Sequence, residues 1–191
     1  FMGIGHIYQA KGEYDTAIDY YSLALDVLEG IDDKAGIGYC LASFGQGYHL
    51  KGDFNNAFDN YKKSLIIFEE IGSQYDIGYT FERIGHIYRV TGELDKAFDY
   101  SFKSLKLFEE INYKAGIGES FLGIAFAYHD IGELDKALDY YTRSLEIYKE
   151  LGDKSNIAAK IGFIGMIHYE KGNYNKSEEL LTKCLAIKNE I

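Results

Sequence analysis

The sequence predicts an all-α protein built from stacked antiparallel helical hairpins, an α-solenoid, and three observations support this fold class. Glycine recurs every 40 residues, at Gly12, Gly52, Gly92, Gly132 and Gly172. Leucine keeps the same step, at Leu25, Leu65, Leu105, Leu145 and Leu185. The chain contains no proline, so nothing in it forbids long helices. A fixed period of about 20–50 residues is typical of repeat arrays, in which each unit buries its apolar face against its neighbours.

The 40-residue step divides the chain into five repeats, which we expect to form a single array: 1–30, 31–70, 71–110, 111–150 and 151–191. Phe1 aligns with Leu41, so the first repeat lacks the segment equivalent to Ile31–Cys40. No polar capping helix follows the last repeat, which ends at Ile191. Since terminal repeats normally carry such a cap, we expect the sequence to be a fragment of a longer chain.

The first helix of each hairpin can be justified from the second repeat. Between Ile37 and Leu50, the apolar residues Leu41, Phe44 and Tyr48 fall on one face of a helix. Gly52 then ends this helix, because glycine readily adopts the positive φ of a helix end. We therefore predict a helix that stops at the recurring glycine.

The second helix of the same repeat is expected to run from about Asn55 to about Glu70. Asn55 is the predicted N-cap, and the same place in the other repeats is taken by Asp15, Asp95, Asp135 and Asn175. The apolar stripe of this helix contains Ala57, Tyr61, Ser64, Leu65 and Phe68. Small residues such as Gly45 and Ala57 are expected to leave space for an aromatic ring of the partner helix.

The third repeat carries the series Phe81, Ile84, Gly85, Tyr88, Gly92, Leu94, Ala97 and Ser104. This series resembles the tetratricopeptide repeat, and the resemblance extends over all five units. The basic unit of that family has 34 residues. The present unit is longer by six residues and lacks the usual proline after its second helix, so it looks like the 40-residue repeats of spindle-orientation adaptors and kinesin light chains. The fifth repeat departs from the pattern, with His168 in place of tyrosine and Ser177 in place of alanine.

The resemblance implies a right-handed superhelix whose concave groove is lined by the first helix of each repeat, on the face that the core does not use. The candidate groove residues are Tyr39, Gln46, His49, Tyr79, Arg83, His86, Arg89, Glu119, Phe126, His129, Phe163, Met166 and Tyr169. Corresponding groove positions differ between repeats, which suggests that each one contacts something different. The alternative is that these side chains are merely tolerated at the surface, or that they pack between successive first helices.

The groove residues predict a protein segment as partner. Aromatic, methionine and arginine side chains are enriched at interface cores. Arg83 and Arg89 offer forked donors to a carboxylate, so we expect the segment to carry apolar anchors and at least one acidic residue. Some family members clamp a terminal carboxylate with lysine and asparagine, but the matching slots here hold Met2, His6, Ala42 and Gln46. We therefore expect an internal segment rather than a chain terminus.

Several classes of function are disfavoured. The formal charge of −10 argues against nucleic-acid binding, and no apolar stretch approaches the roughly 20 residues that span a bilayer. Cys40 and Cys184 lie too far apart for an intrachain bridge, and two free thiols suit the cytoplasm. The histidines of successive repeats are expected to stand about a helix diameter apart, roughly 10 Å, so no metal is predicted. No phosphate loop, HExxH or CxxC motif is present, and we predict neither a cofactor nor an enzyme.

The leading hypothesis is a non-catalytic interaction module or scaffold that holds a peptide or helical segment in its concave groove. One alternative is a regulatory sensor segment of a larger signalling protein, in which an effector changes the curvature of the array. A further alternative is a self-assembling structural array, whose copies associate end to end through the uncapped terminal repeats.

Overall fold

The computed structural model describes residues 1–191 as ten α-helices without any β-strand. The chain forms two compact units, Phe1–Thr91 and Gly92–Ile191, which are described separately below. The division falls inside the third 40-residue repeat, at the turn between its two helices. No helix combines the length with the apolar character that crossing a bilayer would require.

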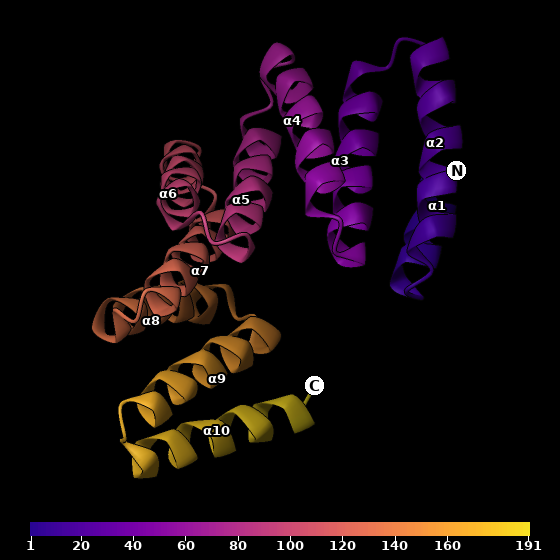
Figure 1. Ribbon diagram of the computed structural model, residues 1–191. Coiled ribbons are helices and arrows are strands. Elements are labelled where there is room, and N and C mark those ends of the chain that lie inside the picture. The colour runs from indigo at the N-terminus through magenta and orange to yellow at the C-terminus, as the bar shows by residue number, and fades with distance from the viewer. The chain divides into compact units, whose positions relative to one another are not determined.

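The first unit contains five helices: α1 (Met2–Ala10), α2 (Tyr14–Gly30), α3 (Lys34–Lys51), α4 (Phe54–Glu70) and α5 (Gln74–Val90). Each helix packs against the next one in the chain, and Figure 1 shows the turns that join them. The core of the first three helices is formed by Ala17, Tyr21, Ala24, Cys40 and Phe44, all of them buried. Helix pairs thus alternate along the chain as the repeat predicts.

The second unit contains the remaining helices: α6 (Leu94–Glu110), α7 (Lys114–Asp130), α8 (Leu134–Leu151), α9 (Lys154–Glu170) and α10 (Tyr174–Asn189). Here too each helix packs against its successor. The core is formed by buried residues of α7, α8, α9 and α10, among them Ala125, Ala137, Tyr141, Ile161, Ile167 and Cys184. We call the first helix of each repeat an A helix (α1, α3, α5, α7, α9) and the second a B helix (α2, α4, α6, α8, α10).

The turns confirm the predicted role of the recurring glycine. Gly52 ends α3 with φ 84°, and its backbone N–H donates to the carbonyl of His49 at 2.9 Å. The other four glycines of the series also have positive φ, between 77° and 83°. Positive φ recurs at the turn between repeats, where Asp32 and Asn112 alternate with glycine. Aspartate and asparagine tolerate this conformation better than other non-glycine residues.

The predicted N-caps of the B helices are wrong by two residues. Helix α4 is capped by Asp53, whose carboxylate accepts a hydrogen bond from the backbone N–H of Asn56 at 3.1 Å, and not by Asn55. In the first, third, fourth and fifth repeats the N-cap positions are Glu13, Glu93, Glu133 and Asn173. Because the glycine has a left-handed conformation, the chain turns sharply, and a single residue, the N-cap, separates the glycine from the first residue of the B helix. Asp15, Asp95 and Asp135 lie instead in the first helical turn. There a carboxylate interacts favourably with the positive end of the helix dipole.

The small residues do make room for aromatic rings, as predicted. A Cβ atom added to Gly45 of α3 would lie 2.7 Å from the ring of Tyr61, which comes from the B helix of the same repeat. In the first repeat, Gly5 faces Tyr21 in the same way. Only glycine allows these rings to pack so closely against the A helix.

Candidate functional site

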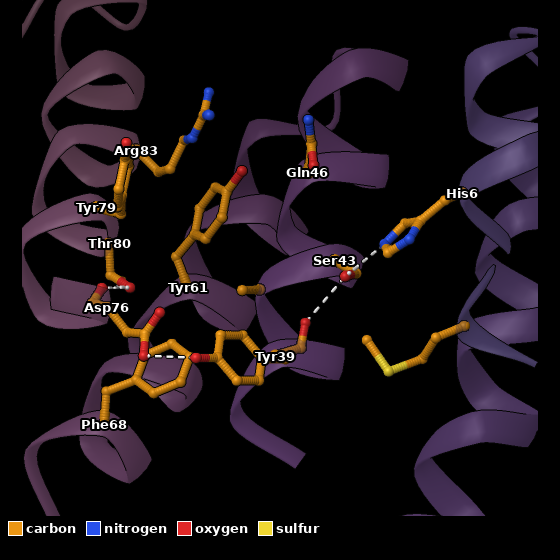
Figure 2. A pocket seen from close by; sticks show the side chains of 12 residues that line it. His6, Tyr39, Ser43, Gln46, Tyr61, Phe68, Asp76, Tyr79, Thr80 and Arg83 are labelled. Carbon is orange, nitrogen blue, oxygen red and sulfur yellow. Dashed lines mark hydrogen bonds between the residues drawn. The ribbon is translucent and has the colours of Figure 1, made fainter. Parts of the chain in front are cut away.

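In the first unit, four of the predicted groove residues line a common cavity of about 350 Å³. These residues are Tyr39 and Gln46 of α3 and Tyr79 and Arg83 of α5. Other lining residues come from α1 and α4, so the cavity opens on the A helices and is backed by a B helix (Figure 2). In each unit, we call the surface formed by the candidate groove residues of the A helices the A-face.

One end of the cavity holds a buried carboxylate, that of Asp76, which is only 7% exposed. Its Oδ2 atom accepts hydrogen bonds from the hydroxyl of Tyr39 at 2.9 Å and from the hydroxyl of Ser73 at 2.5 Å. The bond to Asp76 and, to a smaller degree, burial raise the pKa of Tyr39, so its phenol stays protonated near neutral pH. The arrangement fixes the Tyr39 ring as one wall of the cavity.

The other end of the cavity carries Arg83, Gln46 and the hydroxyl of Tyr61 (Figure 2). Arg83 is exposed, and its guanidinium forms no ion pair in the structure. Tyr61 is 2% exposed, and its hydroxyl has no hydrogen-bond partner. Burial raises the pKa of Tyr61 to about 12, against a smaller opposing effect of Arg83. This end therefore offers positive charge and a proton donor.

Three further groove residues of the first unit lie close to one another. The rings of His49 and His86 are 4.7 Å apart between centroids, and an Nη atom of Arg89 lies 3.3 Å from Nε2 of His86. The expected separation of about 10 Å between histidines of successive repeats is therefore wrong for this pair. Side chains of neighbouring A helices lean toward each other and fill the space that the backbone spacing leaves. No three side chains of the metal-ligating types converge on a site that could hold an ion.

The environment of His49 predicts a pH dependence of stability. Burial and, secondarily, the charge of Arg83 lower its pKa below the ordinary value of 6.5. Below about pH 6.5 the unfolded chain therefore binds a proton that the folded protein does not. The free energy of unfolding decreases as the pH drops from about 6.5 to the lowered pKa of His49. Urea unfolding across this range should show a smaller loss for His49→Gln than for the wild type. Parallel pH profiles for the two proteins would contradict the prediction.

In the second unit, Phe126 and Phe163 form an aromatic cluster with a B-helix tyrosine. The ring of Phe126 meets Phe163 at 5.0 Å and Tyr141 at 5.6 Å, both edge to face, and Phe163 stacks on Tyr141 at 5.5 Å. Met166 and Tyr169 of α9 are exposed. The second unit thus presents apolar side chains on its A helices, partly buried at Phe126 and open at Tyr169.

The remaining groove residues of the second unit already have protein partners. Glu119 accepts a hydrogen bond from Lys160 at 3.1 Å and another from the hydroxyl of Tyr148. His129 lies 2.9 Å from Glu170 through its Nε2 atom. Glu119 and His129 are therefore engaged within the unit, and a ligand would have to compete with these contacts.

The pattern of the sequence missed four residues of the cavity: Tyr61, Phe68, Asp76 and Thr80. The two aromatic residues belong to α4, which was expected to serve the core alone. Asp76 carries a signal that could have been used, because it occupies a slot filled by Gly36 and Gly116 in neighbouring repeats. Gly45 is the signal for Tyr61, since a glycine inside an A helix marks the passage of a ring.

The fold and the A-face define a class: a helical-hairpin repeat protein whose A-face side chains vary between repeats. The sequence model of the tetratricopeptide repeat matches residues 1–70 and 76–150, and a second tetratricopeptide repeat model matches residues 162–191. The chain belongs to the tetratricopeptide repeat family. No curated protein sequence matches it.

Solved structures share this fold at low sequence identity. A kinesin light chain-like protein of Podosopora anserina with nearly identical TPR-like repeats has a TM-score of 0.76 and 13% identity, over 99% of this chain and 93% of its own. A Rap protein complexed with Competence and Sporulation Factor has a TM-score of 0.89 and 15% identity, over 99% of this chain and 53% of its own. A Signal Transduction ATPase with Numerous Domains (STAND) protein with a tetratricopeptide repeat sensor, from Pyrococcus horikoshii, has a TM-score of 0.81 and 18% identity, over 98% of this chain and 29% of its own.

Proposed function

We propose that this protein is a non-catalytic interaction module that binds a peptide or helical protein segment on its A-face. The observation that carries the proposal is the cavity of the first unit, where four predicted groove residues meet around a space of about 350 Å³. Concave, largely apolar sites with a few placed polar groups are typical of ligand binding. The site has the composition of a recognition surface, since Tyr39, Tyr79 and Arg83 belong to the types enriched at interface cores.

The second unit supports the same proposal with a different chemistry. Its A helices offer aromatic and thioether side chains rather than charge, at Phe126, Phe163, Met166 and Tyr169. An apolar anchor of the bound segment would pack against these side chains. We place the chain in the cytoplasm, a proposal supported by the free thiols of Cys40 and Cys184.

The proposal is tested with random linear peptides displayed on phage and selected on the whole chain. For a peptide that contacts the second unit, Phe126→Ala is expected to cost about 2 kcal/mol, a loss of roughly 30-fold in affinity measured by fluorescence anisotropy. Met166→Ala removes an exposed side chain without disturbing the aromatic cluster, so it should weaken binding while leaving the melting temperature unchanged. Both variants act on the A-face.

Lys136→Ala on the B helix α8 is the matched control. Lys136 is exposed, pairs with Glu133 at 3.6 Å and lies over the Tyr128 ring. Its removal should change affinity by less than about 2-fold, which is within 0.5 kcal/mol. Peptides that respond to Lys136→Ala and ignore both A-face variants would move the site to the B helices and refute the proposal.

A regulatory sensor segment is the second candidate, and the comparisons favour it specifically. One structural neighbour is a Rap protein complexed with Competence and Sporulation Factor, and another is a STAND protein with a tetratricopeptide repeat sensor. The chain spans about half of the first and less than a third of the second. A sensor would change its helix arrangement when a peptide binds, so small-angle scattering with and without a selected peptide separates it from a rigid scaffold.

Self-association is a third candidate, supported by exposed leucines on α10. Leu181 and Leu185 are 38% and 61% exposed, and they lie on the last B helix of the second unit. Sedimentation velocity of the wild type and of a Leu181→Ser/Leu185→Ser variant would decide it, because a dimer held by these side chains should be lost in the variant.

A further inference from the structure

We propose that the cavity of the first unit is a subsite for one acidic side chain, aspartate or glutamate, of the bound protein segment. The hydroxyl of Tyr61 donates a hydrogen bond to the carboxylate, and Arg83 supplies the positive charge. This inference rests on the proposed function and specifies which group of the partner is recognised. It adds a hydrogen-bond donor from the B helix α4 to the A-helix side chains of the site.

The repeat itself provides the comparison that singles out Tyr61. Tyr21 occupies the same slot one repeat earlier, and its hydroxyl donates to Oε1 of Gln9 at 2.8 Å. In the second repeat the slot of Gln9 is taken by His49, whose ring packs against His86 and Phe54 at 4.7 and 5.8 Å. The acceptor that serves Tyr21 is thus missing for Tyr61, and the hydroxyl has no partner from the protein.

A buried hydroxyl without a partner favours a ligand that brings an acceptor. Leaving such a group unpaired costs free energy in the unbound protein, and a ligand oxygen that accepts its proton recovers it. Because the phenol stays protonated, its O–H is a donor without a protein acceptor, and a carbonyl or carboxylate oxygen of a ligand can accept from it. A carboxylate is the stronger partner, since an O–H···O⁻ bond is about twice as strong as a neutral one.

The charges of the cavity select the carboxylate. Arg83 stands at the same end as the Tyr61 hydroxyl and has no ion pair (Figure 2). The negative charge of Asp76 is at the opposite end and is already held by Tyr39 and Ser73. An anion is therefore attracted to the Arg83 end, where the planar guanidinium can donate hydrogen bonds to both oxygens of a carboxylate.

The walls fit the stem of an acidic side chain in an internal segment. Met2, Ala42 and Phe68 line the cavity with apolar surface, against which methylene groups can pack. His6 of α1 lines the cavity on one side, and on the other side His86 follows Arg83 by three residues, about one turn, on α5. A bound chain can therefore run past the cavity on both sides, which favours a side-chain carboxylate over a chain terminus.

The test uses peptides selected from the phage library on the whole wild-type chain, synthesised with amidated C-termini. We expect them to share an aspartate or glutamate whose replacement by asparagine or glutamine weakens binding about 10-fold or more. The same replacement should cost less than about 3-fold when measured on Tyr61→Phe or on Arg83→Gln, because each variant lacks one partner of the carboxylate. Tyr21→Phe, which lies outside the cavity, should retain the full 10-fold effect.

Melting temperatures of the variants separate a loss of binding from a loss of folding. Tyr61→Phe removes an unpaired hydroxyl and should leave the melting temperature unchanged or raise it, whereas Tyr21→Phe breaks a hydrogen bond and should lower it. A lower melting temperature for Tyr61→Phe would show that its hydroxyl is bonded in the free protein and would overturn the inference.

The outcomes separate this inference from the proposed function. Peptides that bind the A-face without any acidic residue, or that lose the same affinity on wild type and on both cavity variants, would refute the subsite and leave the interaction module standing. Peptides that bind only with a free C-terminus would assign the cavity to a chain end instead, which also refutes it. A library that yields no peptide responsive to A-face variants would refute the proposed function and the subsite together.

Discussion

Replacing Lys160 with alanine is expected to lower the free energy of unfolding by about 3 kcal/mol, the low end of the range for breaking a buried ion pair. Lys160 is 2% exposed in α9 and donates to Glu119 at 3.1 Å and to the side-chain oxygen of Asn156 at 2.8 Å. Its ammonium also lies 4.4 Å from the centre of the Tyr148 ring. Truncation removes all three contacts, but Glu119 stays 32% exposed, so water can partly replace its lost partner.

Lys154→Ala is the matched control for Lys160→Ala, because it removes an ion pair from the surface of the same helix. Lys154 pairs with Glu190 at 3.4 Å, and both side chains are about 60% exposed. Such pairs contribute about 0–1 kcal/mol. Urea unfolding of the whole chain should therefore separate the two variants clearly. Losses of equal size would show that the buried charge of Lys160 is not stabilised by the contacts described here.

Ala137→Leu is expected to destabilise the second unit by about 1–3 kcal/mol through overpacking. Ala137 is fully buried in α8 and belongs to the same core cluster as Ala125 and Ile161. A leucine there has no space without displacing the neighbouring helices. Asp139→Leu, two residues later, should cost no more than about 1 kcal/mol, because Asp139 is exposed and loses only its surface ion pair with Arg143.

Thermal unfolding of these two variants measures the orientation of the B helices directly. The small residue must face the core, and the acidic residue must face solvent. If Asp139→Leu lowered the melting temperature as much as Ala137→Leu, the packing of α8 would differ from the one described.

The fold could be predicted from the sequence because the repeat supplies the same information five times. The glycine series fixes the ends of the A helices, and the apolar stripes fix the core faces. The caps of the B helices could not be placed from propensity alone, since Asn55 and Asp53 are both good capping residues and only the geometry of the glycine turn distinguishes them. Likewise, the contact between His49 and His86 depends on the direction of the side chains, which helical spacing does not give.

The candidate site could be predicted only in part. The resemblance to the tetratricopeptide repeat indicates which face of the A helices to consider, and helical spacing assigns Tyr39, Gln46, Tyr79 and Arg83 to it; these four line the cavity. Tyr61 was not predicted there, because its periodicity assigns it correctly to the core stripe of α4. Tyr61 belongs to the core and also lines the cavity because its ring packs closely against Gly45 of α3. This contact between two helices cannot be predicted from the pattern of either helix alone.

The passage of Tyr61 across Gly45 has a consequence for inheritance. Both residues lie within one 40-residue repeat, so duplicating or exchanging that segment transfers the glycine and the ring together. Between the first and the second repeat, the hydrogen-bond state of the hydroxyl differs together with one further residue of the same segment, which is Gln9 in the first and His49 in the second. We therefore expect a single substitution at that slot to change a transferred repeat from one whose tyrosine hydroxyl has an acceptor within the protein to one whose hydroxyl is left to an acceptor of the ligand.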